Sequence, residues 1–120
     1  MPDSGYRDLK VWERAMELAA AVYVATDLMP DTERYGLISQ MQRSAVSVAS
    51  NIAEGHSRTH KGDFLKHLSY ARGSLAELET QLEISVRVKR LDRRHAADSW
   101  NLAQETGRML TGLIASLGPK

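Results

Sequence analysis

The 120-residue chain contains 16 Lys and Arg, 15 Asp and Glu and no cysteine, and 42% of its residues are hydrophobic. This length suits one domain, and the lack of cysteine excludes disulfides, thiolate zinc sites and cysteine nucleophiles. No apolar run reaches the roughly 18 residues of a membrane span, and residues 1–5 lack the pattern of a signal peptide, so a cytoplasmic protein without membrane contact is expected.

Residues 1–7 are predicted to form a flexible arm, followed by one helical domain over residues 8–118. The first helix is expected from about Leu9 to about Asp27, with Asp8 as its N-cap. The proline at position 30 ends it, because the residue before proline is pushed out of the α region. Its apolar residues follow two adjacent lines, as in a helix that contacts two neighbours: Trp12, Met16, Ala19 and Tyr23, and Val11, Ala15, Leu18, Val22 and Ala25.

The second helix is expected from about Glu33 to about Arg58, capped by Asp31 or Thr32, and Gly36 weakens its first turns. At about 100° per residue the helix has an apolar side and a polar side. The apolar side carries Leu37, Met41, Ala45, Val48 and Ile52, and the polar side carries Arg43, Ser47, Ser50, Asn51, Glu54 and Arg58.

The polar side of this helix differs from an ordinary solvated face, which usually carries Lys and Glu because they are better helix formers. Serine and asparagine beside a rim of small apolar residues allow another backbone to approach closely. A subunit interface is therefore predicted at Arg43, Ser47, Ser50, Asn51 and Glu54. The alternative is an exposed face with a weak ion pair between Glu54 and Arg58.

The third helix is expected from about Gly62 or Asp63 to about Arg90, and the fourth from about Arg93, after Asp92 as N-cap, to about Leu117. Both have apolar residues spaced by three and four, which places one stripe along each helix. The stripes are Phe64, Leu68, Ala71, Leu75, Leu78, Leu82 and Ser85, and Ala96, Trp100, Ala103, Gly107, Leu110, Ile114 and Leu117. Short connections favour antiparallel neighbours, so the sequence predicts an all-α, up-down-up-down four-helix bundle.

Trp12 and Trp100 occupy stripe positions, which favours a place in the core over a cofactor site. The glycines at positions 73, 107 and 112 interrupt predicted helices at about 1 kcal/mol each relative to alanine. We interpret them as points where two helices approach closely.

Cations are concentrated in two blocks, although the net charge is only +1. The first block surrounds the turn between the second and third helices, and the second surrounds the next turn. The candidate nucleic-acid-binding residues are Arg58, Lys61, Lys66 and Arg72, and Arg87, Lys89, Arg90, Arg93 and Arg94. RNA or DNA phosphates need only well-placed cations. The alternative is a solvated helix end whose cations stabilise the helix dipole.

Sites for metal, cofactor and catalysis find little support in the sequence. His56 and His60, like Asp63 and His67, have the i,i+4 spacing of zinc ligands, but they straddle a predicted turn that does not fix their geometry. The chain has no Gly-rich phosphate loop, HExxH or GxSxG motif. We therefore expect no metal, no cofactor and no enzymatic activity.

Residues 44–55, with the sequence SAVSVASNIAEG, resemble the signature of the four-helix-bundle proteins encoded in intervening sequences of 23S rRNA genes, which are often called ribosomal proteins. Further similar positions are residues 6–12, residues 30–37, Arg43, Phe64, residues 71–74, residues 77–78 and residues 81–82. Ala49 departs from the pattern, because the family usually has proline there. Alanine should leave the second helix straighter, since proline would kink it.

This resemblance implies a four-helix up-down bundle and a ring of five identical subunits. The accessory variability determinant of diversity-generating retroelements is similar to the family, and its association with nucleic acid suggests RNA or DNA as a partner here. The expected function is thus a non-enzymatic homopentamer that binds nucleic acid through basic surface. The alternative is a structural protein-interaction scaffold that does not bind nucleic acid.

Overall fold

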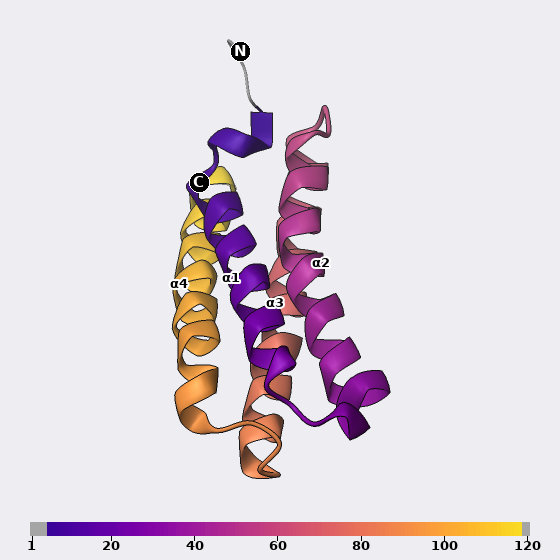
Figure 1. Ribbon diagram of the computed structural model, residues 1–120. Helices are drawn as coiled ribbons and strands as arrows, with labels where there is room; N and C mark the ends of the chain where they lie inside the picture. Colours follow the sequence, from indigo (N-terminus) through magenta and orange to yellow (C-terminus); the bar gives the residue numbers. More distant parts are fainter. Residues whose placement is uncertain (1–4, 119–120) are drawn as a thin grey trace.

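Four long helices account for most of residues 5–118, the part of the chain that the computed structural model describes (Figure 1). They are α1 (Lys10–Asp27), α2 (Ser39–His56), α3 (Lys61–Arg87) and α4 (Arg93–Leu117). Three short helical turns precede α1 and α2: η1 (Gly5–Asp8), η2 (Asp31–Glu33) and η3 (Arg34–Ile38). Residues 5–118 contain no β-strand.

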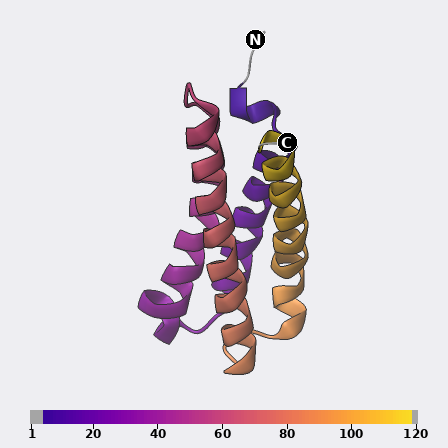
Figure 2. The same ribbon diagram turned by 180° about the vertical axis from the view of Figure 1, so that it is seen from behind.

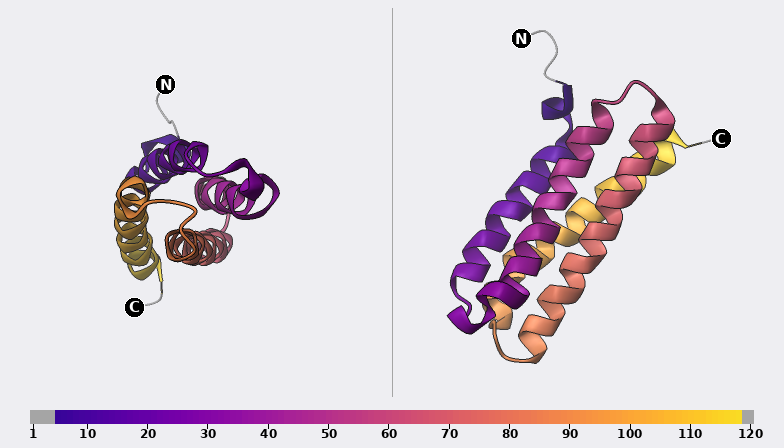
Figure 3. Two further views of the ribbon diagram at one scale, coloured as in Figure 1. Left: turned by 60° about the horizontal axis from the view of Figure 1, so that its bottom comes forward. Right: turned by 90° about the vertical axis from the view of Figure 1, so that its right-hand side faces the viewer.

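Successive helices run in opposite directions, and α4 returns beside α1 to close the bundle (Figures 1 and 2). The end-on view in Figure 3 shows the four helices around a common axis in chain order. This arrangement confirms the predicted all-α up-down bundle. No helix in the described part of the chain has the length and apolar character needed to cross a lipid bilayer.

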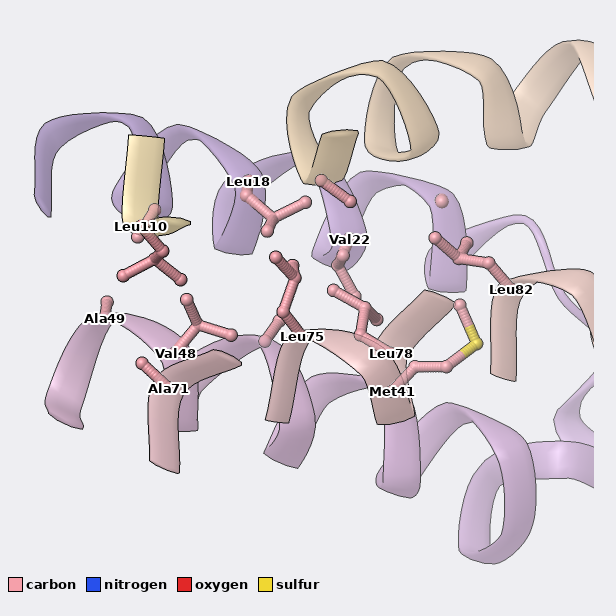
Figure 4. Close-up of a cluster of buried hydrophobic side chains, with 14 of the residues drawn as sticks. Leu18, Val22, Met41, Val48, Ala49, Ala71, Leu75, Leu78, Leu82 and Leu110 are labelled. Carbon is pink, nitrogen blue, oxygen red and sulfur yellow. The ribbon is translucent and has the colours of Figure 1, made fainter. Parts of the chain in front are cut away.

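The core lies along the axis and is built from aliphatic side chains of all four helices (Figure 4). The predicted stripe of α3 is confirmed, because every member from Leu68 to Ser85 is buried and only Phe64 remains partly exposed. On α2, Met41, Val48 and Ile52 are fully buried, as expected. Burying a large aliphatic side chain contributes about 1.5–3 kcal/mol to folding, so these stripes hold the bundle together.

The stripe of α1 is narrower than predicted. The line from Val11 to Ala25 is buried, whereas Met16 and Tyr23 on the second line are 43% and 45% exposed. Trp12 is half-buried and packs edge-on against Tyr6 of η1, with the ring centroids 5.1 Å apart. Residues 5–7 of the predicted arm therefore have a defined position, while residues 1–4 lie outside the described residues.

The beginnings of α1 and α2 differ from the prediction. Leu9, not Asp8, is the N-cap of α1, because residues 5–8 form η1. The second helix was expected from Glu33, but Gly36 breaks it with φ −117° and ψ −110°, and α2 begins only at Ser39. Glycine lacks a side chain and readily adopts such a conformation. From Ser39 onward α2 is continuous through Ala49.

The prediction that the helical glycines mark close helix contacts is confirmed for Gly107 and wrong for Gly73 and Gly112. A Cβ atom at Gly107 would lie 3.2 Å from Leu75, but one at Gly73 or Gly112 would have no neighbour within 4 Å. The tightest contact instead involves Gly55 near the end of α2. A Cβ there would lie 2.6 Å from the Cβ of His67 on α3, so glycine allows the two backbones to approach.

Gly55→Ala should lower the free energy of unfolding by about 1–3 kcal/mol, because the added methyl group overpacks the contact between α2 and α3. Gly112→Ala is the matched control, and it should raise stability by up to about 1 kcal/mol through helix propensity alone. Urea denaturation followed by circular dichroism measures both. Equal stabilisation by the two alanines would contradict the close contact.

Candidate functional site

Polar side chains of α2 and α3 form a hydrogen-bonded chain along the contact between these helices. The hydroxyl oxygens of Ser47 and Ser74 lie 2.8 Å apart, and Asn51 Nδ2 donates to the Ser47 carbonyl at 2.9 Å and to its Oγ at 3.0 Å. Asn51 Oδ1 lies 3.1 Å from Nδ1 of His67. We call these four residues the α2–α3 seam. Since half-buried polar groups need partners, the seam aligns the two helices.

The outer edge of the seam is charged. Arg58 donates to Glu54 Oε2 at 2.7 Å, and the same oxygen lies 4.0 Å from His67 Nε2. The His67 ring also packs edge-on against Tyr70, with centroids 5.6 Å apart. His67 is therefore held by α2 and by its own helix, and its side chain is only 14% exposed.

The five residues predicted as a subunit interface fall into two groups. Ser47 and Asn51 are half-buried against α3 within one chain, whereas Arg43, Ser50 and Glu54 remain exposed. The sequence alone could not distinguish the two groups, because Ser47 and Asn51 are covered by Ser74 and His67 of α3, which lie far along the chain. The interface itself remains a prediction.

Arg43 lies one helical turn before Ser47 and takes no part in the hydrogen bonds of the seam. Among residues 5–118 it has no hydrogen bond or ion pair, and it lines a hollow of about 390 Å³ between the end of α1 and the start of α2. Tyr23 and Val46, at 45% and 44% exposure, line the same hollow. We call Tyr23, Arg43 and Val46 the Arg43 surface. It combines a free cation with apolar area, a composition typical of interface centres.

The two basic blocks lie at opposite ends of the bundle, since α3 runs from one to the other (Figure 1). The first block is dispersed. Arg58 is paired with Glu54, and Arg72 lies 11 residues beyond Lys61, or roughly 16 Å along the helix. Arg72 lines a hollow on the side of α4 together with Arg108, away from the turn.

The second block is compact, because five cations occupy residues 87–94 around the turn between α3 and α4. We call Arg87, Lys89, Arg90, Arg93 and Arg94 the basic turn. Arg87 pairs with Glu83 at 3.8 Å and Arg90 with Glu33 at 3.1 Å, while the other three have no ion pair within residues 5–118. All five are exposed.

The backbone of the basic turn is tightly closed. Lys89 adopts a left-handed conformation with φ 63°, and the N–H groups of Arg90 and Leu91 both donate to the Ser85 carbonyl. This pattern is a common way to end a helix. It reverses the chain within a few residues, which brings the last turn of α3 beside the first turn of α4.

A groove between α3 and α4 was not predicted. It is lined by Ala76, Glu79, Thr80, Glu83, Ile84, Arg87 and Trp100 and has a volume of about 420 Å³. Trp100, expected in the core, is half-buried and also lines an adjoining hollow of about 310 Å³. We call the first of these, the 420 Å³ groove, the Trp100 groove. Its only sequence signal was the pair of acidic residues four apart, Glu79 and Glu83.

The carboxylate of Glu79 is the most perturbed group in the groove. It accepts a 2.7 Å hydrogen bond from Gln104 Nε2 on α4. Burial raises the pKa of Glu79, and repulsion from Glu83 adds to the rise. A cation placed between Glu79 and Glu83 would relieve the repulsion between the two carboxylates.

The histidines near the α2–α3 turn make contacts other than metal ligation. His56 packs edge-on against Phe64 with centroids 5.4 Å apart, and His67 belongs to the seam. Across residues 5–118, no three side chains of the metal-binding types converge.

Comparisons with known proteins agree with this architecture. The family model described as "23S rRNA-intervening sequence protein" matches residues 7–112. A crystal structure of a protein with unknown function from the S23 ribosomal protein family of Bacteroides thetaiotaomicron is similar in fold, with a TM-score of 0.79 and 24% sequence identity. The match covers 88% of this chain and 95% of that chain. No curated protein matches the chain.

Asn51→Ala should lower the free energy of unfolding by about 1–2 kcal/mol, since it removes the hydrogen-bond partner of His67 Nδ1 and one of the two partners of the Ser47 hydroxyl. Ser50→Ala, one residue away and exposed, is the control and should change stability by less than about 0.5 kcal/mol. Thermal or urea unfolding of both variants provides the comparison. An Asn51 variant as stable as the Ser50 variant would show that the seam does not align the helices.

Proposed function

The chain belongs to the 23S rRNA-intervening sequence protein family, and from this premise we propose that it is a non-enzymatic, self-associating helix bundle that binds nucleic acid. The observation that carries the proposal is the basic turn. Five exposed cations there occupy eight residues, and three of them have no ion pair in the described part of the chain. Unpaired cations can neutralise backbone phosphates and release their counterions.

The basic turn is better suited to phosphate binding than the first block. Its cations lie on one short turn and two adjoining helix ends, so they can face a single strand of RNA or DNA. In the first block Arg58 is paired and Arg72 is roughly 16 Å away along α3. With a net charge of +1, attraction must come from this local cluster.

Self-association is the second part of the proposal, and the Arg43 surface supports it. The exposed apolar area of Tyr23 and Val46, beside a cation with no partner among residues 5–118, suits a protein contact. The resemblance to the family suggests a ring of five. A ring would repeat the basic turn around one axis and so raise the local positive potential.

The assignment as a cytoplasmic protein without enzymatic activity or cofactor belongs to the same proposal. The half-buried Ser47, Asn51 and His67 bond to one another or to Ser74 across the contact between α2 and α3, which supports the non-enzymatic part of the assignment. Kinship with the accessory variability determinant of retroelements is also proposed, on the motifs described above. A purely structural scaffold is the competing function, and nucleic-acid binding separates the two.

Light scattering coupled to gel filtration should give a single species several times the 13.4 kDa of the chain. A ring of five corresponds to about 67 kDa, five times the chain mass. The measurement is made at micromolar concentration and repeated after tenfold dilution. A 13.4 kDa species at both concentrations would remove the self-association half of the proposal.

Nucleic-acid binding is tested by fluorescence anisotropy with a short single-stranded RNA between about 50 and 200 mM salt. Affinity should fall with salt, and Arg93→Ala with Arg94→Ala should reduce the slope of log affinity against log salt by about 1.4, or about 0.7 per lost phosphate contact. Lys61→Ala with Lys66→Ala removes the same charge from the other end and should change the slope less. Binding that is absent or independent of salt would leave the scaffold function standing.

A further inference from the structure

We propose that the Trp100 groove of one chain receives the Arg43 surface of a second copy of this chain. The inference rests on the self-association proposed above and identifies the two surfaces that meet. Arg43 would enter the groove beside Glu83 and Glu79, while Tyr23 and Val46 would cover its apolar floor. Both halves of this contact lie on the same chain, so its copies can join head to tail.

The groove has the features of an acceptor. Its floor is formed by Trp100, Ile84 and Ala76, and Ile84 is 42% exposed. Two carboxylates line it, and Glu79 is fixed by the hydrogen bond from Gln104. An aromatic floor beside carboxylates suits an arginine, because its guanidinium can stack on the ring and at the same time donate hydrogen bonds to a carboxylate.

The electrostatics of the groove also favour a cation from outside. The groove itself is lined by two carboxylates and one cation, Arg87, which lies 3.8 Å from Glu83 and is 81% exposed. Arg93 lines the adjoining hollow, and Arg72 and Arg108 line a further hollow that shares Glu79 with the groove. Because the pKa of Glu79 is raised by burial and by Glu83, a second cation would stabilise its charged form.

The Arg43 surface supplies the complementary chemistry. Arg43 lacks a hydrogen-bond or ion-pair partner in residues 5–118, and it is flanked by an aromatic and an aliphatic side chain. The two surfaces differ in charge, because Arg43 is a cation and the Trp100 groove is lined by Glu79 and Glu83. Charge and apolar character therefore match across the two surfaces.

The two surfaces lie on opposite sides of the bundle. In the end-on view of Figure 3, the face between α1 and α2 is opposite the face between α3 and α4. Two different surfaces that meet form a heterologous contact, which produces a ring if the rotation closes and a filament if it does not. One chain thus donates Arg43 to one neighbour and accepts it from another.

Charge reversal tests this pairing, because both chosen residues are exposed and their replacement should leave the fold intact. Arg43→Glu and Glu83→Arg should each weaken assembly at least tenfold, measured as the dissociation constant by mass photometry. Glu77→Arg, on the same helix but outside the Trp100 groove, and Lys66→Glu are the matched controls and should assemble like the unaltered chain. Circular dichroism checks that all variants are folded.

Combining the two charge reversals, in one chain or in a mixture, tests whether Arg43 and Glu83 contact each other. The double variant Arg43→Glu with Glu83→Arg should recover assembly, and an equimolar mixture of the single variants should form species that contain both chains. Assembly that survives each single reversal, or that the double variant fails to recover, would overturn this pairing while leaving self-association intact. An unaltered chain that is monomeric would overturn both proposals.

Discussion

The close approach of α2 to α3 is the constraint on which the other features depend. Gly55 allows the backbones to come so near that the seam from Ser47 and Asn51 to His67 and Ser74 can form direct hydrogen bonds. These bonds satisfy the polar groups of α2 that face α3. Arg43 lies on the outer side of α2 and takes no part in them. The interior is mostly aliphatic, and the buried hydroxyl groups of Ser85 and Thr106 donate to carbonyls of their own helices.

Sequence periodicity predicted the helices and their buried faces well. The stripe from Leu68 to Ser85 and the start of α4 at Arg93 follow from spacing and chain reversal alone, which are local properties. The beginning of α2 was predicted less well. A helical pattern continues through Gly36, but glycine permits a break, and the packing of η2 and η3 decides whether one occurs.

The candidate surfaces were harder to foresee, because they depend on which helix lies beside which face. The polar side of α2 could be recognised, yet its division into Asn51 against α3 and Arg43 toward solvent depends on residues far along the chain. Trp100 followed the core stripe and still lines a groove, since α3 and α4 leave its ring only half covered. Charge clusters such as the basic turn are local in sequence and were therefore visible from it.

At Lys89, whose backbone is left-handed, the residue that would give the most stable turn differs from the residue that gives the turn its charge. A residue with a Cβ atom loses roughly 1–2 kcal/mol in this conformation, and glycine would avoid the strain. Yet glycine would also remove one of five positive charges from the site proposed to meet phosphate. Selection for heat resistance alone would therefore favour glycine and a less basic turn, whereas the phosphate contact proposed above would favour the lysine despite its strain.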